Sequence, residues 1–218
     1  MNEIEALVRT VKLKETKHGV KILAHDPLLT YIGVGRSAAV FRINNSKRVL
    51  KVFLPQLAHI AWEEAEIYRM LKDCSYYPKL YESGHGFVVI DYIEGITLFN
   101  CLKAGISVTE EMISEVDLAL DYAKQKGLNP SDIHLRNIIF TPEGTIKLID
   151  VARFRQDKDC SQWKDLKKAF YTVYQSSLFP KKVPEKLLNL TSTLYKRDLL
   201  RVVLKNSEST NESDKKIV

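Results

Sequence analysis

The sequence has few cysteines and no long hydrophobic run. Its three cysteines, Cys74, Cys101 and Cys160, lie far apart, and no two of them have the spacing of metal ligands or of a redox pair. This excludes a disulfide framework and is typical of reduced cysteines in a cytoplasmic protein. No apolar stretch approaches the roughly 20 residues of a membrane-spanning helix, and the acidic first residues carry no secretory signal core. We therefore expect a cytoplasmic protein that does not associate with membranes.

Acidic residues are outnumbered, but no dense basic tract is present. The 218 residues carry a net charge of +6, and the pI is about 9.1. Such a balance favours anionic partners, namely nucleotides, acidic proteins or nucleic acid. The basic residues are spread along the chain, so charge alone does not select among these partners. The length suffices for one domain or two small lobes, and the polar tail at 206–218 is predicted to be disordered.

Internal repeats are also absent, and the pattern changes from β-rich to helix-rich near the middle of the chain. The first 17 residues follow an amphipathic helical spacing. Apolar β-rich runs alternate with turn signals after them, interrupted by one helix that Pro55 opens. The predicted strands of this half are 28–36, 38–43, 48–53, 79–81 and 87–92.

The second half is predicted to be mostly helical. A helix at 109–126 begins with Thr109 as its cap and ends before Gly127. A hairpin of 138–140 and 145–150 follows, then a helix around 163–173 and one or two more between 184 and 204. The fold class is therefore α+β, with an antiparallel β half containing one helix and then a helical half.

Two charged residues occupy positions that otherwise carry apolar side chains. Lys51 shares a strand face with Val49 and Phe53, because side chains alternate along a strand. Glu64 lies on the apolar stripe of the following helix. A lone buried charge costs several kcal/mol, so pairing of the two with each other is the simplest solution. Each could instead extend its charged end to solvent from an edge of the fold.

Three further features are ambiguous when each is taken alone. Asp132 and Asn137 lie five residues apart on a polar loop between rigid elements, where catalytic groups often lie, but also where ordinary turns lie. Asp150 ends an apolar strand, either as a cation ligand or as a simple strand terminus. Gly33 and Gly35 join two strands and would allow a phosphate to approach the backbone closely, although most such pairs are only turns.

Taken in order along the chain, these residues resemble the protein-kinase signature set. The order is Gly33-x-Gly35-x-x-Ala38-x-Val40, Lys51, Glu64, Asp132-x-x-x-x-Asn137 and Asp150. The resemblance covers 28–153, and the short architecture also resembles the RIO-type and other small atypical protein kinases. The loop containing His134, two residues after Asp132, looks more like that of the aminoglycoside and choline kinases.

The resemblance implies a bilobal fold, a nucleotide site and a set of roles. One kinase-like domain would span 1–205, with an N-terminal lobe at about 18–93 and a C-terminal lobe at about 94–205. The cofactors would be ATP and Mg²⁺, with Asp132, Lys51, Glu64 and His134 in the catalytic group and Asn137 and Asp150 as metal ligands. The nucleotide would contact Ile32, Gly33, Gly35, Val40, Val49, Lys51, Ile90, Asp91, Ile93 and Ile139.

Departures from the kinase pattern leave the acceptor open. Ala38 replaces the third glycine, Pro130-Ser131 precedes Asp132 instead of His-Arg, and Asp150-Val151-Ala152 replaces Asp-Phe-Gly. The segment after Asp150 is short and has no Ala-Pro-Glu motif. We expect a serine/threonine-protein kinase, with a small-molecule or sugar kinase and a nucleotide-binding pseudokinase scaffold as alternatives. The partner besides ATP would be a protein or a small hydroxylated substrate, and a folded basic stripe would favour nucleic acid.

Overall fold

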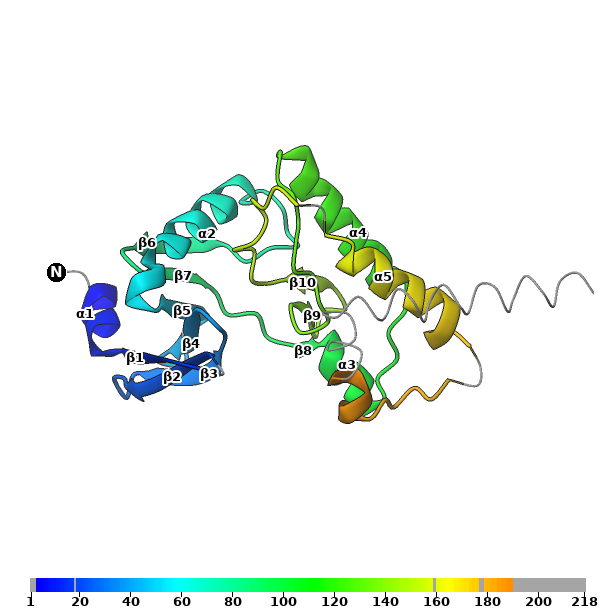
Figure 1. Ribbon diagram of the computed structural model, residues 1–218, viewed down its shortest axis with the longest axis horizontal. Coiled ribbons are helices and arrows are strands. Elements are labelled where there is room, and N and C mark those ends of the chain that lie inside the picture. The colour runs from blue at the N-terminus through cyan, green and yellow to red at the C-terminus, as the bar shows by residue number, and fades with distance from the viewer. Residues whose placement is uncertain (1–2, 18, 159, 177–178, 190–218) are drawn as a thin grey trace, which may run out of the picture.

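The computed structural model describes residues 3–17, 19–158, 160–176 and 179–189, and it has an α+β fold (Figure 1). An antiparallel sheet dominates the first half, and helices dominate the second half, as the sequence predicts. Further helices were predicted between 184 and 204, and most of that region, 190–204, lies outside the described residues. The tail at 206–218, predicted to be disordered, also lies outside them. No helix in the described part of the chain has the length and apolar composition of a membrane span.

The central sheet has five antiparallel strands in the order β3-β4-β5-β7-β6. Their bounds are Leu29–Val34 (β3), Ala38–Ile43 (β4), Arg48–Phe53 (β5), Leu80–Gly84 (β6) and Phe87–Asp91 (β7). These are the five strands that alternation and turn signals predict, and most ends differ from the prediction by only one or two residues. One 3₁₀ turn, Pro55–Leu57, leads into helix α2, Ala58–Met70, between β5 and β6.

The two faces of this sheet pack against different elements. Buried side chains such as Phe41 and Leu50 pack with Leu7 of helix α1, Glu3–Thr10. The opposite face, with Val49, Val88 and Ile90, packs with α2. Because side chains alternate along β5, Lys51 lies on the second face, toward α2.

The predicted helix at the start of the chain is shorter than expected. It ends at Thr10, and strands β1, Lys12–Thr16, and β2, Gly19–Ala24, form an antiparallel hairpin after it. The helical spacing of apolar residues ends with Val11, which is buried with Val20 beneath the hairpin. The sheet structure of the chain therefore begins at Lys12.

The segment between the two halves passes close to a second small sheet. Strands β8, Ile96–Thr97, β9, Ile138–Phe140, and β10, Ile146–Leu148, form this sheet in the order β10-β9-β8. Gly95, with φ 147°, precedes β8. A Cβ atom there would fall on the carbonyl oxygen of Phe140 and 2.7 Å from Cγ2 of Ile139. Glycine is thus needed for both backbone conformation and space.

We expect Gly95→Ala to destabilise the protein by about 2–6 kcal/mol, because backbone strain costs about 1–3 kcal/mol and overpacking about 1–3 kcal/mol. Gly127→Ala is a control, since Gly127 has φ 76° but a Cβ there meets no described atom within 4 Å. The control should cost only about 1–2 kcal/mol. Urea unfolding measures the free energy of unfolding of both variants. Equal decreases in the two variants would show that the contact of residue 95 with β9 is unimportant.

Helices complete the second half of the chain. Helix α3, Leu98–Ala104, follows β8, and α4, Glu110–Gln125, begins at its cap Thr109, whose hydroxyl accepts a hydrogen bond from Met112 N at 3.4 Å. Helix α5, Gln162–Ala169, continues into one π-helical turn, Phe170–Tyr174. The helix at 109–126, the hairpin and the helix around 163–173 are confirmed, whereas α3 was not predicted.

Candidate functional site

The two buried charges predicted to pair do so. Lys51 Nζ lies 2.7 Å from Oε2 and 3.0 Å from Oε1 of Glu64, so β5 and α2 are joined by an ion pair. Glu64 is completely buried and Lys51 nearly so. Lys51 Nζ also lies 2.9 Å from Oδ1 of Asp150, which is 99 residues further along the chain. Lys51 therefore joins the sheet, the helix and the segment after β10 at one point.

Burial and mutual attraction set the charges of this group. Burial alone would lower the pKa of Lys51, but the carboxylates of Glu64 and Asp150 raise it above its ordinary value. Burial raises the pKa of Glu64, and Lys51 opposes that effect. The positive charge of Lys51 lowers the pKa of Asp150 against the effect of burial. Lys51 is thus cationic and Asp150 anionic at neutral pH.

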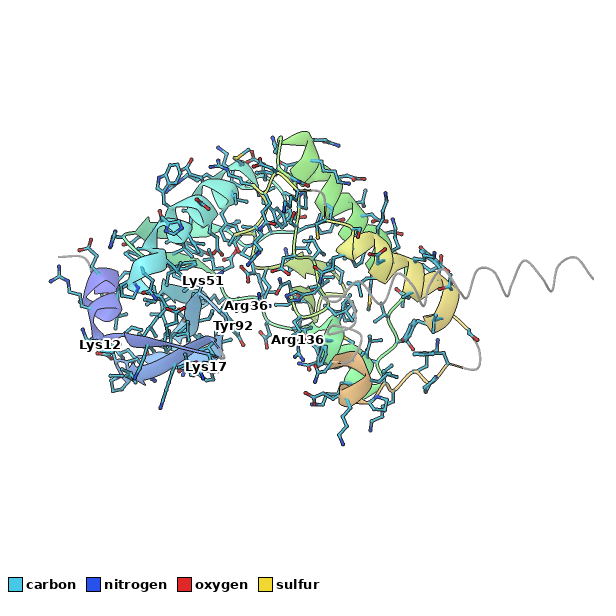
Figure 2. The ribbon with its side chains drawn as sticks, in the orientation of Figure 1. Lys12, Lys17, Arg36, Lys51, Tyr92 and Arg136 are labelled. Carbon is cyan, nitrogen blue, oxygen red and sulfur yellow. The ribbon has the colours of Figure 1, made fainter. Side chains whose placement is uncertain are left out.

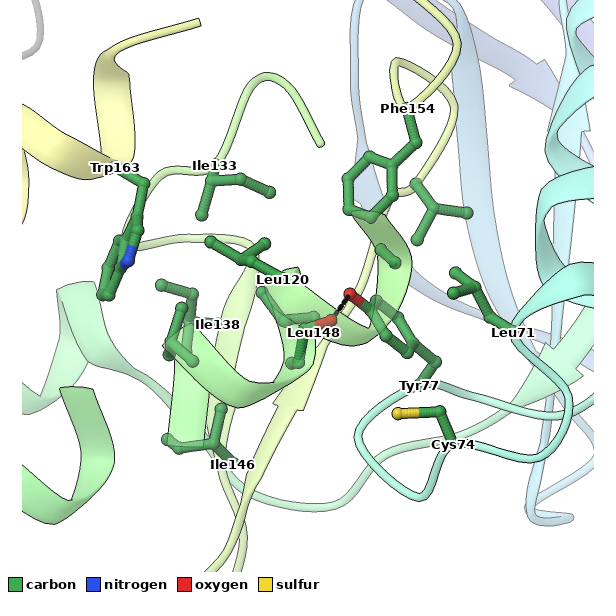
Figure 3. Close-up of a cluster of buried hydrophobic side chains, with 14 of the residues drawn as sticks. Leu71, Cys74, Tyr77, Leu120, Ile133, Ile138, Ile146, Leu148, Phe154 and Trp163 are labelled. Carbon is green, nitrogen blue, oxygen red and sulfur yellow. Dashed lines mark hydrogen bonds between the residues drawn. The ribbon is translucent and has the colours of Figure 1, made fainter. Parts of the chain in front are cut away.

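The loop containing Asp132 and Asn137 is fixed by apolar anchors at both ends. Ile133 and Ile138 are buried in a core that also includes Leu148, Phe154 and Trp163 (Figure 3). This core lies directly beneath the loop and next to β10, the strand that leads to Asp150. The alternation of buried and polar residues in the loop therefore presents polar side chains above a rigid base.

Hydrogen bonds within the loop bring its polar residues to Asp150. Asn137 Nδ2 donates to the backbone oxygen of Asp132 at 3.3 Å. The backbone N–H of Ile149 donates to the backbone carbonyl oxygen of Asn137 at 2.9 Å. Asp132 and Asp150 both have positive φ, 61° and 62°, a conformation that costs energy for residues other than glycine and is often held at functional sites.

The side chains of Asp132 and His134 have different surroundings. Asp132 is about half exposed, and its Oδ2 lies 3.4 Å from Nε of Arg153. His134 is partly buried, and burial lowers its pKa even though Asp132 and Asp150 oppose that effect. His134 is therefore largely neutral at pH 7, whereas the exposed carboxylate of Asp132 can receive a hydrogen bond from an incoming group.

Gly33, near the end of β3, and Gly35, directly after β3, leave open space. Gly33 pairs with Val40, and Gly35 N donates to Ala38 O at 2.9 Å. Neither glycine has a positive φ. A Cβ built on Gly33 meets no described atom within 4 Å, and one on Gly35 meets only Ala38 O at 3.9 Å. Because conformation does not require glycine here, space for a bound group explains these residues better than a turn does.

The remaining predicted ligand contacts come from several strands. Val49 pairs with Ile90 across β5 and β7, and Val40 pairs with Lys51 across β4 and β5, so all four side chains lie on one face of the sheet. Ile32 is exposed on β3. Ile139 lies against Gly95 on the other side of the connecting segment. These residues offer apolar surface from both halves of the chain.

The segment that connects β7 to β8, from Asp91 at the end of β7 to Gly95, has backbone groups that could hydrogen-bond a ligand. The Asp91 carboxylate is already used, since Oδ1 accepts from Tyr81 at 2.6 Å and Oδ2 from Lys79 N at 2.8 Å. The backbone N–H of Ile93 makes no hydrogen bond to any residue that the structure describes. It is therefore free to donate to a ligand, as a planar heterocycle would require.

Sequence reasoning missed Asn129 and Arg153. The backbone N–H of Asn129 donates to Phe154 O at 2.7 Å, and its side chain donates to Gln156 O at 2.7 Å and Lys158 O at 3.3 Å. Asn129 thus ties the start of the Asp132 loop to the segment after Asp150. No local pattern identifies Asn129 or Arg153, because each acts through a contact distant in sequence.

Oxygen ligands for a divalent cation are present in this group. Asp150 contributes a carboxylate, and the side-chain oxygen of Asn137 is an amide acceptor, both of which magnesium uses. Among the described residues, no three His, Cys, Asp or Glu side chains form a cluster suited to a metal. Magnesium commonly takes one or two protein ligands together with phosphates and water, so Asp150 and Asn137 fit that ion.

Comparison with known proteins decides the family. No family model matches the sequence. A curated protein of Bacillus subtilis (strain 168), named "Putative serine/threonine-protein kinase YrzF", is 45% identical over 200 residues, which are 91% of this chain and 93% of that protein. The chain belongs to this kinase-like family.

Proposed function

We propose that this kinase-like protein transfers phosphate from ATP, with magnesium, to serine or threonine hydroxyls of proteins in the cytoplasm. The observation that carries the proposal is Lys51, which contacts both Glu64 and Asp150. A lysine oriented by a glutamate beside a metal-binding aspartate is the arrangement that positions ATP phosphates in protein kinases. The match to a named kinase over most of both chains supports the same activity.

The proposed domain is bilobal and spans 1–205. The N-terminal lobe, at about 18–93, would contain the five-stranded sheet and α2, and the C-terminal lobe, at about 94–205, the later helices. The hairpin β1–β2 would add residues 12–17 to the first lobe. ATP would lie between the lobes, with its base against Val40, Val49 and Ile139 and hydrogen-bonded by Asp91 and Ile93 backbone groups.

Each polar residue would have one task. Gly33 and Gly35 would let the phosphates approach the backbone, and Lys51 would hold the α- and β-phosphates. Asp150 and Asn137 would hold the magnesium, which supplies positive charge to the phosphates when bound. Asp132 would accept a hydrogen bond from the acceptor hydroxyl and orient it toward the γ-phosphate. His134, being neutral, would add a hydrogen bond beside Asp132.

A kinase of small hydroxylated molecules is the second candidate. His134 supports it, because that position resembles the aminoglycoside and choline kinases more than the typical Ser/Thr kinases. Resemblance to the RIO-type kinases and the 45% identical relative favour a protein acceptor instead. A pseudokinase scaffold would tolerate loss of the polar signature residues, yet all five are present: Lys51, Glu64, Asp132, Asn137 and Asp150.

Transfer of labelled γ-phosphate tests the proposal. Purified protein is incubated with ATP and magnesium, alone, with cell extract, and with a panel of small hydroxylated acceptors. We expect label on serine or threonine of proteins. Label only on small molecules would replace the protein acceptor with the second candidate, and no label with intact nucleotide binding would favour a scaffold.

We expect activity to be independent of phosphorylation between Asp150 and Asp165. In regulated kinases an arginine before the catalytic aspartate pairs with a loop phosphate, but Ser131 holds that position, almost fully buried, and donates to Asn129 O at 3.1 Å. Asn129 instead holds the loop by direct hydrogen bonds. Phosphatase treatment and Ser161→Ala should each leave the turnover rate within about twofold, since no transition-state contact is removed. Loss of activity restored by phosphorylating Ser161 would contradict this.

A further inference from the structure

The β1–β2 hairpin has one apolar face and one basic face. Leu13, Val20 and Ile22 pack against the sheet together with Val11. Side chains alternate along each strand, so the opposite face carries Lys12, Lys14, Lys21 and Leu23, all exposed. We refer to these four residues as the basic face of the hairpin.

The lysines of the basic face repel one another. Lys14 and Lys21 are direct partners across the two strands, an arrangement that destabilises a sheet when both side chains carry the same charge. No carboxylate within the described part of the chain forms an ion pair with Lys12, Lys14 or Lys21. The neighbouring Glu15 alternates to the other face and accepts from Gln56 at 2.8 Å. An anionic partner would explain why this repulsion is kept.

The start of β2, next to Lys21 of the basic face, contacts the glycine-containing segment of the candidate site. Val20 N donates to Gly35 O at 3.1 Å. A Cβ on Gly19 would lie 2.7 Å from that same oxygen, so the hairpin and the turn are in close contact. Figure 2 shows Lys12 and Lys17 on the hairpin and Arg36 beyond it, toward the second half of the chain. A partner bound to the hairpin would therefore lie close to the proposed phosphate site.

A shallow groove of mixed polar and apolar lining adjoins the basic face. It has a volume of about 590 Å³ and lies between β2 and β3, and its walls include Leu23, Tyr31 and Val34. These three side chains are 58%, 53% and 45% exposed. A partner that combines negative charge with an apolar side chain would bury this surface as well as neutralise the lysines.

We propose that the basic face and this groove dock an extended acidic segment of the protein acceptor. Lys12 and Lys14 repeat every second residue, at roughly 6.7 Å, which is also the repeat of alternate carboxylates on an extended peptide. The hairpin has no Phe, Tyr or Trp, and the groove adds only Tyr31, so this surface lacks the series of aromatic side chains on which successive nucleic-acid bases stack. The inference rests on the proposed kinase function and adds to it the class of acceptor, namely acidic proteins.

The test measures docking without nucleotide, so that it does not depend on catalysis. The probe is a fluorescein-labelled 12-residue peptide in which glutamate alternates with threonine and one leucine, and anisotropy gives its Kd. The combined change Lys12→Gln, Lys14→Gln and Lys21→Gln should weaken binding about tenfold, as loss of three exposed ion pairs predicts. The charge-matched control is Lys72→Gln, Lys124→Gln and Lys126→Gln on other exposed surfaces, which should change Kd by less than about twofold.

A second measurement separates docking from a structural role. Lys14→Gln alone should raise the Tm, because it removes the repulsion from Lys21, while it weakens peptide binding. A lower Tm would mean that Lys14 is structural and would overturn the inference. So would equal binding by the basic-face variant and wild type, or tighter binding of an RNA 12-mer through the same lysines. Wild-type protein that binds the peptide but transfers no phosphate would count only against the proposed function, because docking is measured without nucleotide.

Discussion

Asp132→Ala should lose phosphate transfer by about 10²–10⁴-fold while it keeps its fold and most of its affinity for ATP. That range is the usual contribution of a positioned proton acceptor. Asp132 is half exposed, and its carboxylate pairs with Arg153, which is not among the proposed nucleotide contacts. Asn137 donates to the backbone oxygen of Asp132, which the change to alanine keeps. An interaction made mainly in the transition state changes turnover and leaves ground-state binding unchanged.

Three measurements on this variant separate catalysis from folding. The thermal midpoint, the ATP Kd and the turnover rate are compared with those of Asp121→Ala, an exposed aspartate on α4 that pairs with Lys124. If Asp132 only shapes the loop, activity should fall in proportion to the folded fraction. A folded, ATP-binding variant that turns over near the wild-type rate would remove Asp132 from the mechanism.

Asp150→Ala should weaken magnesium-dependent nucleotide binding by more than about 100-fold. Removal of a residue that only hydrogen-bonds to a metal ligand typically lowers metal affinity or activity by about 10–100-fold. Asp150 is proposed as a direct ligand, so its removal should have a larger effect. Lys51 would keep its ion pair with Glu64, so the fold should survive the change. Titration calorimetry with ATP, in the presence and absence of magnesium, measures the effect.

The matched control for this change is Asp157→Ala, an exposed aspartate seven positions further along the same segment. It should bind magnesium–ATP as wild type does. If Asp150→Ala binds equally well, Asp150 only ends its strand and the metal is held elsewhere. If binding is lost equally with and without magnesium, Asp150 acts through Lys51 rather than through the metal.

The sequence predicted the residues of the site better than it predicted their supports. Lys51 and Glu64 were identifiable because a charge on an apolar face needs a partner, and the 2.7 Å contact confirms the pairing. The five strands followed from alternation and turn signals. Both signals are local, so a single sequence is enough to show them.

The supports depend on contacts between distant segments. The sequence around Gly95 does not show that Phe140 packs against it. Likewise, the sequence around Arg153 does not show that it pairs with Asp132. Strand β1 was predicted as part of a helix because Leu7, Val8 and Val11 follow a helical spacing. Pairing of Lys12–Thr16 with Gly19–Ala24 prevails there, since it buries Leu13, Val20 and Ile22 on the sheet.

The most direct test of the account is transfer of the γ-phosphate of labelled ATP to an acidic, serine-containing protein in magnesium, with chelator and with Asp132→Ala and Asp150→Ala alongside. The account predicts phosphoserine or phosphothreonine with wild type and magnesium, and background label in the other three reactions. Label that persists with chelator or in both variants would contradict it, because transfer would then not use the residues that meet at Lys51.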